Sequence, residues 1–250
     1  MISTLATNPN RSQNESGKER SDFSKGIKLG IPIALGYIPV AFTFGMMAVN
    51  GGIPVWIAIL ISLTNLTSAG QFAGTGLIIA NASLYEITLT TLVVNIRYLL
   101  MSLALSQKIT GMSRLKKCLI AFGITDETFA VASLEKEEIS FAYLTGLIIG
   151  PYWGWAFGTA LGALTTSILP QRLQSPMGIA LYAMFIALFV PASKRSRSAL
   201  VVVIMAIFLS SVFKWTPCLN QISAGWSIII ATLIAAAVGA LLFPVKEEKE

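Results

Sequence analysis

The sequence predicts an all-α polytopic membrane protein, a helix bundle of about six to seven spans in which proline and glycine break several helices. Only 12% of the 250 residues are charged, against about 25% in soluble domains, and 54% are hydrophobic with a mean hydropathy of +0.72. The apolar residues also gather into stretches near the ~20 residues that one helical span needs. We expect a single transmembrane domain over residues 25–245, a disordered cytosolic tail at 1–24 and a short cytosolic tail at 246–250.

Several chemistries are excluded by residue types and motifs that the chain lacks. There is no histidine, which removes His-based hydrolase triads and His-ligated zinc or haem. Cys118 and Cys218 are far apart in apolar surroundings and form no CxxC pair, so we interpret both as packing residues. No GxxxxGK[ST] run occurs, so we expect no nucleotide site. Basic residues lie at span ends rather than on a solvated face, so we expect no nucleic-acid partner. We expect no enzyme activity, no cofactor and no metal.

The first span is predicted over the apolar stretch from Leu29 to Val49. Pro32, Pro39 and Gly45 lie within it. Each proline removes a backbone donor and strains the preceding turn, so we expect helix breaks, as kinks or an unwound segment, at these three residues. A membrane tolerates unwound backbone only where protein or a cavity satisfies its polar groups.

The segment from Pro54 to Ala80 has a polar, glycine-rich centre between two short apolar halves. Its central run, SLTNLTSAGQFAGTG, carries Asn65, Thr67, Ser68, Gly70, Gln71, Gly74 and Gly76. This pattern is typical of a discontinuous or re-entrant helix. The alternative is helix packing through small residues of the Gly-xxx-Gly kind.

Arg97 stands at the midpoint of the next apolar stretch, Ile87 to Gln107, with no other charge between Glu86 and Lys108. An arginine at mid-bilayer costs about 2.5 to 3.5 kcal/mol on insertion scales, so it normally faces a water-filled cavity or a partner. The alternative is that Arg97 binds the C-terminal carbonyl groups of a broken helix.

A polar stripe runs along the same predicted helix at steps of three and four residues. It consists of Thr88, Thr91, Asn95, Tyr98 and Ser102. At about 100° per residue, Arg97 points about 130° away from the centre of this stripe, so one regular helix cannot direct both into one cavity. Either the helix is broken at this point or Arg97 meets a different neighbour.

Asp126 and Glu127 are adjacent acids in the middle of an apolar segment, residues 118–134, that is too short to span the membrane. With Thr125 as a candidate N-cap, one interpretation is an ordinary helix start at the membrane surface. The other is a carboxylate that faces the transport pathway, as a proton carrier or as the counter-ion of Arg97.

Apolar stretches in the second half of the sequence predict further spans at Ile139 to Leu169, Met177 to Val190, Ala199 to Phe213 and Ile222 to Phe243. We expect helix breaks at Gly150 and Pro151. The runs GYIPVAFTFG at 36–45 and GPYWGWAFG at 150–158 suggest a weak internal repeat, which is a pointer to a transporter. Basic residues predict that both termini lie in the cytosol, with residues 54–80 as a re-entrant hairpin; the alternative is a conventional count of seven spans.

Broken helices, a polar segment at mid-depth and a buried arginine together predict a small-solute site near the midplane of the membrane. Without a nucleotide site, transport needs an ion gradient, most simply protons, or a separate energising subunit. A proton would be carried by Asp126, Glu127 or Glu86. The alternatives are a channel for another small neutral solute and a membrane scaffold subunit without a solute path.

The chain resembles the AzlC-type branched-chain amino acid exporters, also described as azaleucine-resistance permeases. The resemblance rests on GIPIALGYIPVAFTFG at 30–45, SAGQFAG at 68–74, Asn95-x-Arg97 and ITDETFA at 124–130. It implies secondary export of valine, leucine, isoleucine or similar neutral amino acids through the cytoplasmic membrane, with a small AzlD-type membrane subunit as partner. Where the family often has histidine after the Asn-x-Arg, this chain has Tyr98.

A zwitterionic amino acid needs a positive group for its carboxylate, acceptors for its ammonium group and an apolar pocket. Arg97 or the amides near Gly70 would serve the carboxylate, and Asn65, Gln71 or Asp126 the ammonium group. Aromatic candidates for the pocket are Phe42, Phe44, Phe72 and Tyr98. The expected substrate-binding residues are therefore Asn65, Gly70, Gln71, Phe72, Asn95, Arg97 and Tyr98, with Asp126 and Glu127 coupling the ion.

Overall fold

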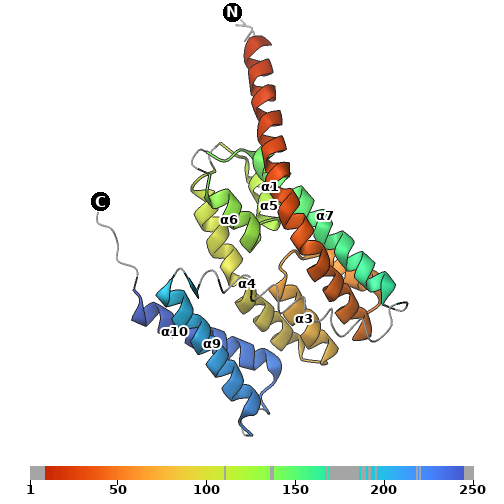
Figure 1. Ribbon diagram of the computed structural model, residues 1–250, viewed down its shortest axis with the longest axis vertical. Coiled ribbons are helices and arrows are strands. Elements are labelled where there is room, and N and C mark those ends of the chain that lie inside the picture. The colour runs from red at the N-terminus through yellow and green to blue at the C-terminus, as the bar shows by residue number, and fades with distance from the viewer. Residues whose placement is uncertain are drawn as a thin grey trace, which may run out of the picture.

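The computed structural model describes residues 9–109, 111–135, 138–166, 168, 186, 190, 193–194, 196–217, 219 and 221–244. Within them every regular element is an α-helix (Figure 1), which confirms the all-α prediction. The helices are α1 (Pro9–Asn50), α2 (Val55–Thr64), α3 (Ala69–Ile79), α4 (Leu84–Ser106), α5 (Arg114–Phe122), α6 (Asp126–Ser133), α7 (Phe141–Thr165), α9 (Arg197–Trp215) and α10 (Ala224–Leu242).

Five helices of the described part are long and apolar enough to cross a membrane: α1 from Gly17 onward, α4, α7, α9 and α10. They confirm a helical membrane bundle. The expected span from Met177 to Val190 falls almost wholly outside the described residues. At the amino end the structure differs from the expected disordered tail, because α1 begins at Pro9 and residues 9–24 are helical.

Serine residues begin four of the helices. The side chains of Ser83, Ser113, Ser140 and Ser196 each accept a hydrogen bond from the backbone N–H three residues further on, at the start of α4, α5, α7 and α9. Such caps satisfy one of the backbone donors that the first helical turn leaves unpaired. The start of each helix is therefore set by a local signal in the sequence.

Helices α1 and α7 lie side by side (Figure 1). Glycine allows their backbones to touch: a Cβ atom on Gly30 would lie 2.6 Å from the carbonyl oxygen of Leu147, and one on Gly45 would lie 2.7 Å from the nitrogen of Ala163. Because both residue numbers increase together along the contact, the two helices run in the same direction. Small residues that bring backbones together are a common means of packing helices in membranes.

Of the two forms expected for the helix breaks, the unwound segment is not observed. Helix α1 continues through Pro32, Pro39 and Gly45, and α7 continues through Gly150 and Pro151. Neighbouring helices can satisfy the carbonyl groups that a proline leaves free, so a membrane helix accepts proline without unwinding. The glycines serve the close approach of α1 and α7, and the ring of Pro151 is buried in that contact.

We expect Gly158→Ala to destabilise the protein by about 1–3 kcal/mol, because overpacking a close contact forces the two backbones apart. The added methyl group would lie 2.5 Å from the carbonyl oxygen of Ile38 in α1. Gly36→Ala is the matched control, since a Cβ atom there meets nothing within 4 Å. Thermal unfolding in detergent measures both variants, and an equal Tm for the two would contradict this packing.

Helices α2 and α3 form a hairpin of two short helices joined by residues 65–68 (the first hairpin). It starts after Pro54 and returns to the same end of the bundle, because Ile79 at the end of α3 lies against Gly51, just beyond α1. The tip reaches the middle of α7, where the hydroxyl of Tyr152 donates a hydrogen bond of 3.0 Å to the carbonyl of Leu63. The structure thus adopts the re-entrant form for residues 54–80.

Helices α5 and α6 form a second hairpin that enters from the opposite end of the bundle. Near its base, Lys25 of α1 pairs with Glu135 at 2.7 Å, and this hydrogen bond lowers the pKa of the Glu135 carboxyl. At its tip, Thr125 accepts a hydrogen bond of 2.8 Å from Tyr37, about three turns further along α1. The two hairpins therefore point toward each other.

Glu86 fastens α10 to the start of α4. Its Oε1 accepts hydrogen bonds from the hydroxyl of Ser223 (2.5 Å) and the backbone N–H of Gly225 (3.0 Å), at the beginning of α10. A carboxylate is favoured at a helix N-terminus by the helix dipole. Glu86, one of the acids considered as a proton carrier, is thus buried in a structural contact.

Candidate functional site

The tips of the two hairpins meet at the middle of α4. The hydroxyl of Tyr98 donates a hydrogen bond of 2.9 Å to the carbonyl of Thr67, in the first tip. Arg97 donates from Nη2 to the Tyr98 hydroxyl (3.3 Å) and pairs with Oδ2 of Asp126, in the second tip, at 2.9 Å. A continuous chain of polar contacts joins the tips. We call these residues and their polar neighbours the central polar cluster, which consists of Asn65, Thr67, Ser68, Asn95, Arg97, Tyr98, Asp126 and Glu127.

Arg97 lies on an unbroken helix, so its angle from the polar stripe is explained by a different neighbour. That neighbour is Asp126, as the counter-ion interpretation predicted, whereas the carbonyl group beyond α2 is bound by Tyr98. The side chains of Arg97 and Asp126 are 33% and 20% exposed. Neither side chain is therefore fully enclosed by protein.

Two residues of the polar stripe, Asn95 and Thr91, pack against glycine residues of α3. A Cβ atom on Gly70 would lie 2.6 Å from Nδ2 of Asn95, and one on Gly74 would lie 2.9 Å from Cγ2 of Thr91. Gly70 therefore contributes space for the Asn95 amide, next to the N-terminus of α3. The Gly-xxx-Gly alternative was thus also partly right, since these glycines pack α3 of the first hairpin against α4.

Three buried polar atoms of the central polar cluster have no hydrogen-bond partner among the described residues: Oγ of Ser68, Oδ1 of Asn95 and Nε of Arg97. Ser68 also has a φ of 46°, a left-handed value that is uncommon outside glycine, and its side chain does not cap α3. Buried polar atoms are normally paired, and backbone strain gathers at functional sites. A hydroxyl, a carbonyl acceptor and a guanidinium donor here suit a small polar ligand.

The second tip presents two carboxylates to the same region. Thr125 begins α6 with a capping box that includes Thr128, and the first turn carries Asp126 and Glu127. Oε2 of Glu127 accepts a hydrogen bond of 2.5 Å from the hydroxyl of Tyr37. The helix start is ordinary in its capping, as one interpretation held, but it lies against the middle of α1 and α4 rather than at the end of the bundle.

Two residues expected to bind substrate have structural contacts instead. Gln71 is 1% exposed, donates from Nε2 to Oγ of Ser62 (2.6 Å) and accepts at Oε1 from Nε1 of Trp155 (2.9 Å). Both ends of its amide are therefore occupied. Phe72 packs edge-on against Phe44, with 5.3 Å between ring centres, in the hydrophobic core.

Sequence reasoning missed the residues that fasten both tips to α1 and α7. Thr159 of α7 shares a hydrogen bond of 2.7 Å with Ser62, which braces the first hairpin. The ring of Tyr37 packs edge-on against Trp155, with 5.3 Å between ring centres, and its hydroxyl reaches the second tip. Tyr37 and Trp155 both lie in the two weakly similar runs, which was the available signal.

Comparison with known proteins finds relatives among membrane proteins. The model of the AzlC protein family matches residues 32–169, which include both hairpins. The inner membrane protein YgaZ of Escherichia coli strain K12 is 32% identical over 184 residues, covering 70% of this chain and 75% of that protein. An uncharacterized membrane protein of Archaeoglobus fulgidus is 37% identical over 175 residues, covering 69% and 76%. Another from Helicobacter pylori strain 26695 is 30% identical over 204 residues, covering 77% and 88%. No solved structure matches.

Proposed function

The chain belongs to the AzlC family of membrane proteins, which is consistent with a role in membrane transport, and from this premise we propose that it is a secondary transporter. Its proposed activity is export of branched-chain or similar neutral amino acids across the cytoplasmic membrane. In this proposal both termini lie in the cytosol and a small AzlD-type membrane subunit is the partner. The observation that carries it is the central polar cluster, where two hairpins from opposite ends meet around unpaired polar atoms.

The chemistry of the cluster matches a zwitterion. Nε of Arg97 is a free donor for a carboxylate, and the N-terminus of α3 at Gly70 adds the positive end of a helix dipole. The free Oδ1 of Asn95 and the carboxylate of Asp126 are acceptors for an ammonium group. A neutral amino acid would thus replace part of the Arg97–Asp126 pair with two complementary contacts.

The opposed hairpins provide a means of alternating access. Each covers the cluster from one end of the bundle only, so movement of one hairpin opens the site to one side while the other stays closed. Binding at the midplane between such elements is how several secondary transporters are built. A ligand that contacts both tips at once would couple the movements of the two hairpins.

Glu127 is the proposed proton carrier. It follows Asp126 in the sequence, but its hydrogen bond is with the hydroxyl of Tyr37 on α1 rather than with a basic side chain. Protonation of Glu127 would change that hydrogen bond and hence the contact between the second tip and α1. The proton is thus linked to the position of the hairpin.

The direct test is the amount of valine, leucine and isoleucine inside cells fed branched-chain dipeptides, with and without this protein and its small partner. Lower internal amino acid only with the intact protein, and not with Arg97→Ala, is the expected result. Unchanged pools despite correct insertion of both proteins would contradict the export proposal. Saturable counterflow in proteoliposomes separates a carrier from a channel, since a channel shows none.

Gly70→Ala is expected to raise the KM for the transported amino acid by about tenfold, equivalent to about 1.4 kcal/mol of lost binding. The added Cβ would displace the Asn95 side chain, whose Nδ2 lies 2.6 Å from its position; the three atoms nearest to this Cβ all belong to that side chain. Gly76→Ala, further along the same helix, is the control because a Cβ atom there meets nothing within 4 Å. Equal KM values for the two variants would remove Asn95 from the site.

A further inference from the structure

An open apolar groove lies between α5 and α7, apart from the central polar cluster. Its walls include Leu119 and Phe122 of α5 and Phe141, Ile148 and Ile149 of α7, and its volume is about 290 Å³. Leu119 is 59% exposed and Phe122 47%. With nine residues α5 is about 13.5 Å long, less than half of the ~30 Å apolar thickness of a membrane. The half-length helix therefore leaves the flank of α7 open to lipid.

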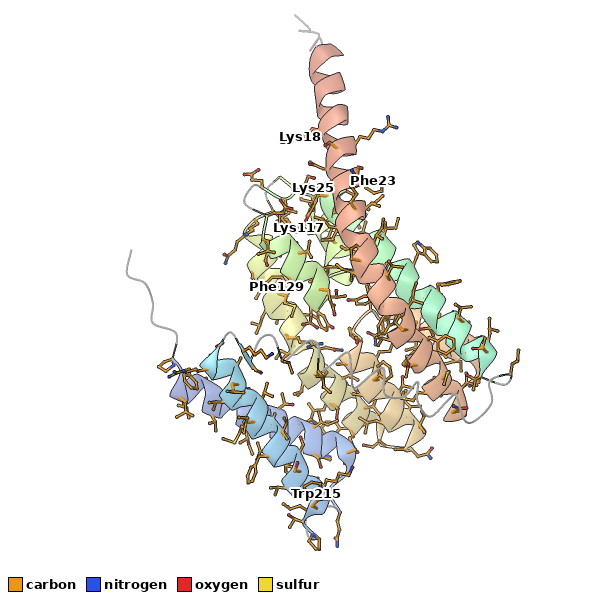
Figure 2. The ribbon with its side chains drawn as sticks, in the orientation of Figure 1. Lys18, Phe23, Lys25, Lys117, Phe129 and Trp215 are labelled. Carbon is orange, nitrogen blue, oxygen red and sulfur yellow. The ribbon has the colours of Figure 1, made fainter. Side chains whose placement is uncertain are left out.

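Basic residues stand at one end of this groove. Nζ of Lys116 lies 5.0 Å above the ring of Phe141, which forms the wall at that end. Arg114 and Lys117 are exposed on the same first turn of α5, which carries no acidic residue. The two ion pairs of the described residues, on Lys25 and Arg97, use none of these three side chains. Lys117 lies at the same end of the bundle as Lys25 (Figure 2).

We propose that this groove and its basic end form a binding site for one anionic phospholipid. The acyl chain lies between α5 and α7, and the phosphate contacts Lys116 and Arg114. Charge complementarity selects this occupant: it must be apolar along the groove and negative at the level of the first turn of α5. Basic residues next to membrane helices attract anionic headgroups in this way.

The site has a structural consequence for the second hairpin. A lipid wedged between α5 and α7 holds the base of that hairpin against α7 while its tip, at Asp126, stays in the central polar cluster. Anionic lipid should therefore stabilise the closed position of the hairpin. The binding site itself depends only on the fold and not on the identity of the transported solute.

Native mass spectrometry of the detergent-solubilised full chain, mixed with phosphatidylglycerol or phosphatidylcholine, tests the site. One phosphatidylglycerol is expected to stay bound where phosphatidylcholine does not. Arg114→Gln with Lys116→Gln should weaken retention by about thirtyfold, the effect expected for two basic residues near an anionic lipid. Lys28→Gln, which removes one exposed charge from α1 at the same end of the bundle, should retain the lipid like the wild type.

The groove itself is tested by Ile149→Trp, which fills it at a position that is 41% exposed and adds no charge. Loss of phosphatidylglycerol in this variant supports a bound acyl chain, whereas full retention would overturn it. Equal retention by the charge variant and the wild type, or dimers that replace bound lipid, would also overturn the proposal. Should a variant fail to fold, a photoactivatable phosphatidylglycerol on the wild type must label α5 and α7, and labelling elsewhere would contradict the site.

Discussion

Arg97→Ala is expected to lower the rate of L-valine counterflow in proteoliposomes by about 30-fold. Truncating one partner of a buried, hydrogen-bonded charge pair costs about 2–5 kcal/mol, and we take the lower value, about 2 kcal/mol, because the protein buries this pair only in part. The side chains of Arg97 and Asp126 are 33% and 20% exposed. The variant removes both the free donor Nε and the partner of Asp126.

Arg197→Ala is the matched control, because Arg197 is an exposed arginine at the start of α9 and far in sequence from the cluster. It should transport valine at the wild-type rate. The double variant Arg97→Gln with Asp126→Asn removes both charges together, so it should recover stability without recovering transport. Wild-type counterflow in Arg97→Ala would exclude Arg97 from the substrate site.

Glu127→Gln is expected to abolish transport driven by a pH gradient while leaving valine exchange at equal pH within about threefold of wild type. An amide cannot release a proton, but it preserves the size of the side chain and still accepts a hydrogen bond from Tyr37. Loss of that hydrogen bond would cost about 0.5–1.5 kcal/mol, so keeping it limits the effect on exchange. The measurement is valine flux in proteoliposomes with and without an imposed pH gradient.

The control for this variant is Glu138→Gln, which makes the same change at an exposed residue before α7. It should keep the full response to the gradient. Tyr37→Phe removes the donor and leaves the carboxylate, so it should shift the pH dependence of flux without abolishing coupling. A gradient response that survives in Glu127→Gln would assign the proton to another group.

The first hairpin shows what the sequence can predict. Its polar centre from Asn65 to Gly76 cannot face lipid, and the distribution of basic residues required the segment to return to its starting side. The contact of Ile79 with Gly51 shows that it does. Periodicity and charge were sufficient here because a membrane penalises unpaired polar groups more severely than water does.

Arg97 could be identified from the sequence in the same way, but its full surroundings could not. The cost of a buried guanidinium required a partner, and Asp126 was among the candidates. The angle between Arg97 and the polar stripe left two interpretations, a broken helix or a different neighbour for Arg97. The structure has an unbroken helix, with α6 beside Arg97 and α3 beside Asn95. Pairwise reasoning succeeded because few charges exist in this part of the chain.

Proline and glycine were misleading when read as local signals. Gly45 and Pro151 suggested breaks, yet they lie in continuous helices whose backbones touch. A sequence shows that a residue lacks a Cβ atom or a donor, but not whether a neighbouring helix uses the space. The structural contacts of Gln71, expected to bind substrate, were missed for a related reason. Its partners Ser62 and Trp155 come from two other helices.

Central to the proposed function is that the first tip lines a substrate site in the middle of the membrane. The most direct test is labelling by a water-soluble thiol reagent. The variant is Asn65→Cys, in a chain whose Cys118 and Cys218 are replaced by serine. Leu60→Cys, on the exposed side of α2 and 48% exposed, is the control and should stay unlabelled in lipid. We predict that Asn65→Cys is labelled and that L-valine slows the labelling. Labelling that valine does not change, in a variant that still transports valine, would contradict a substrate site at the first tip.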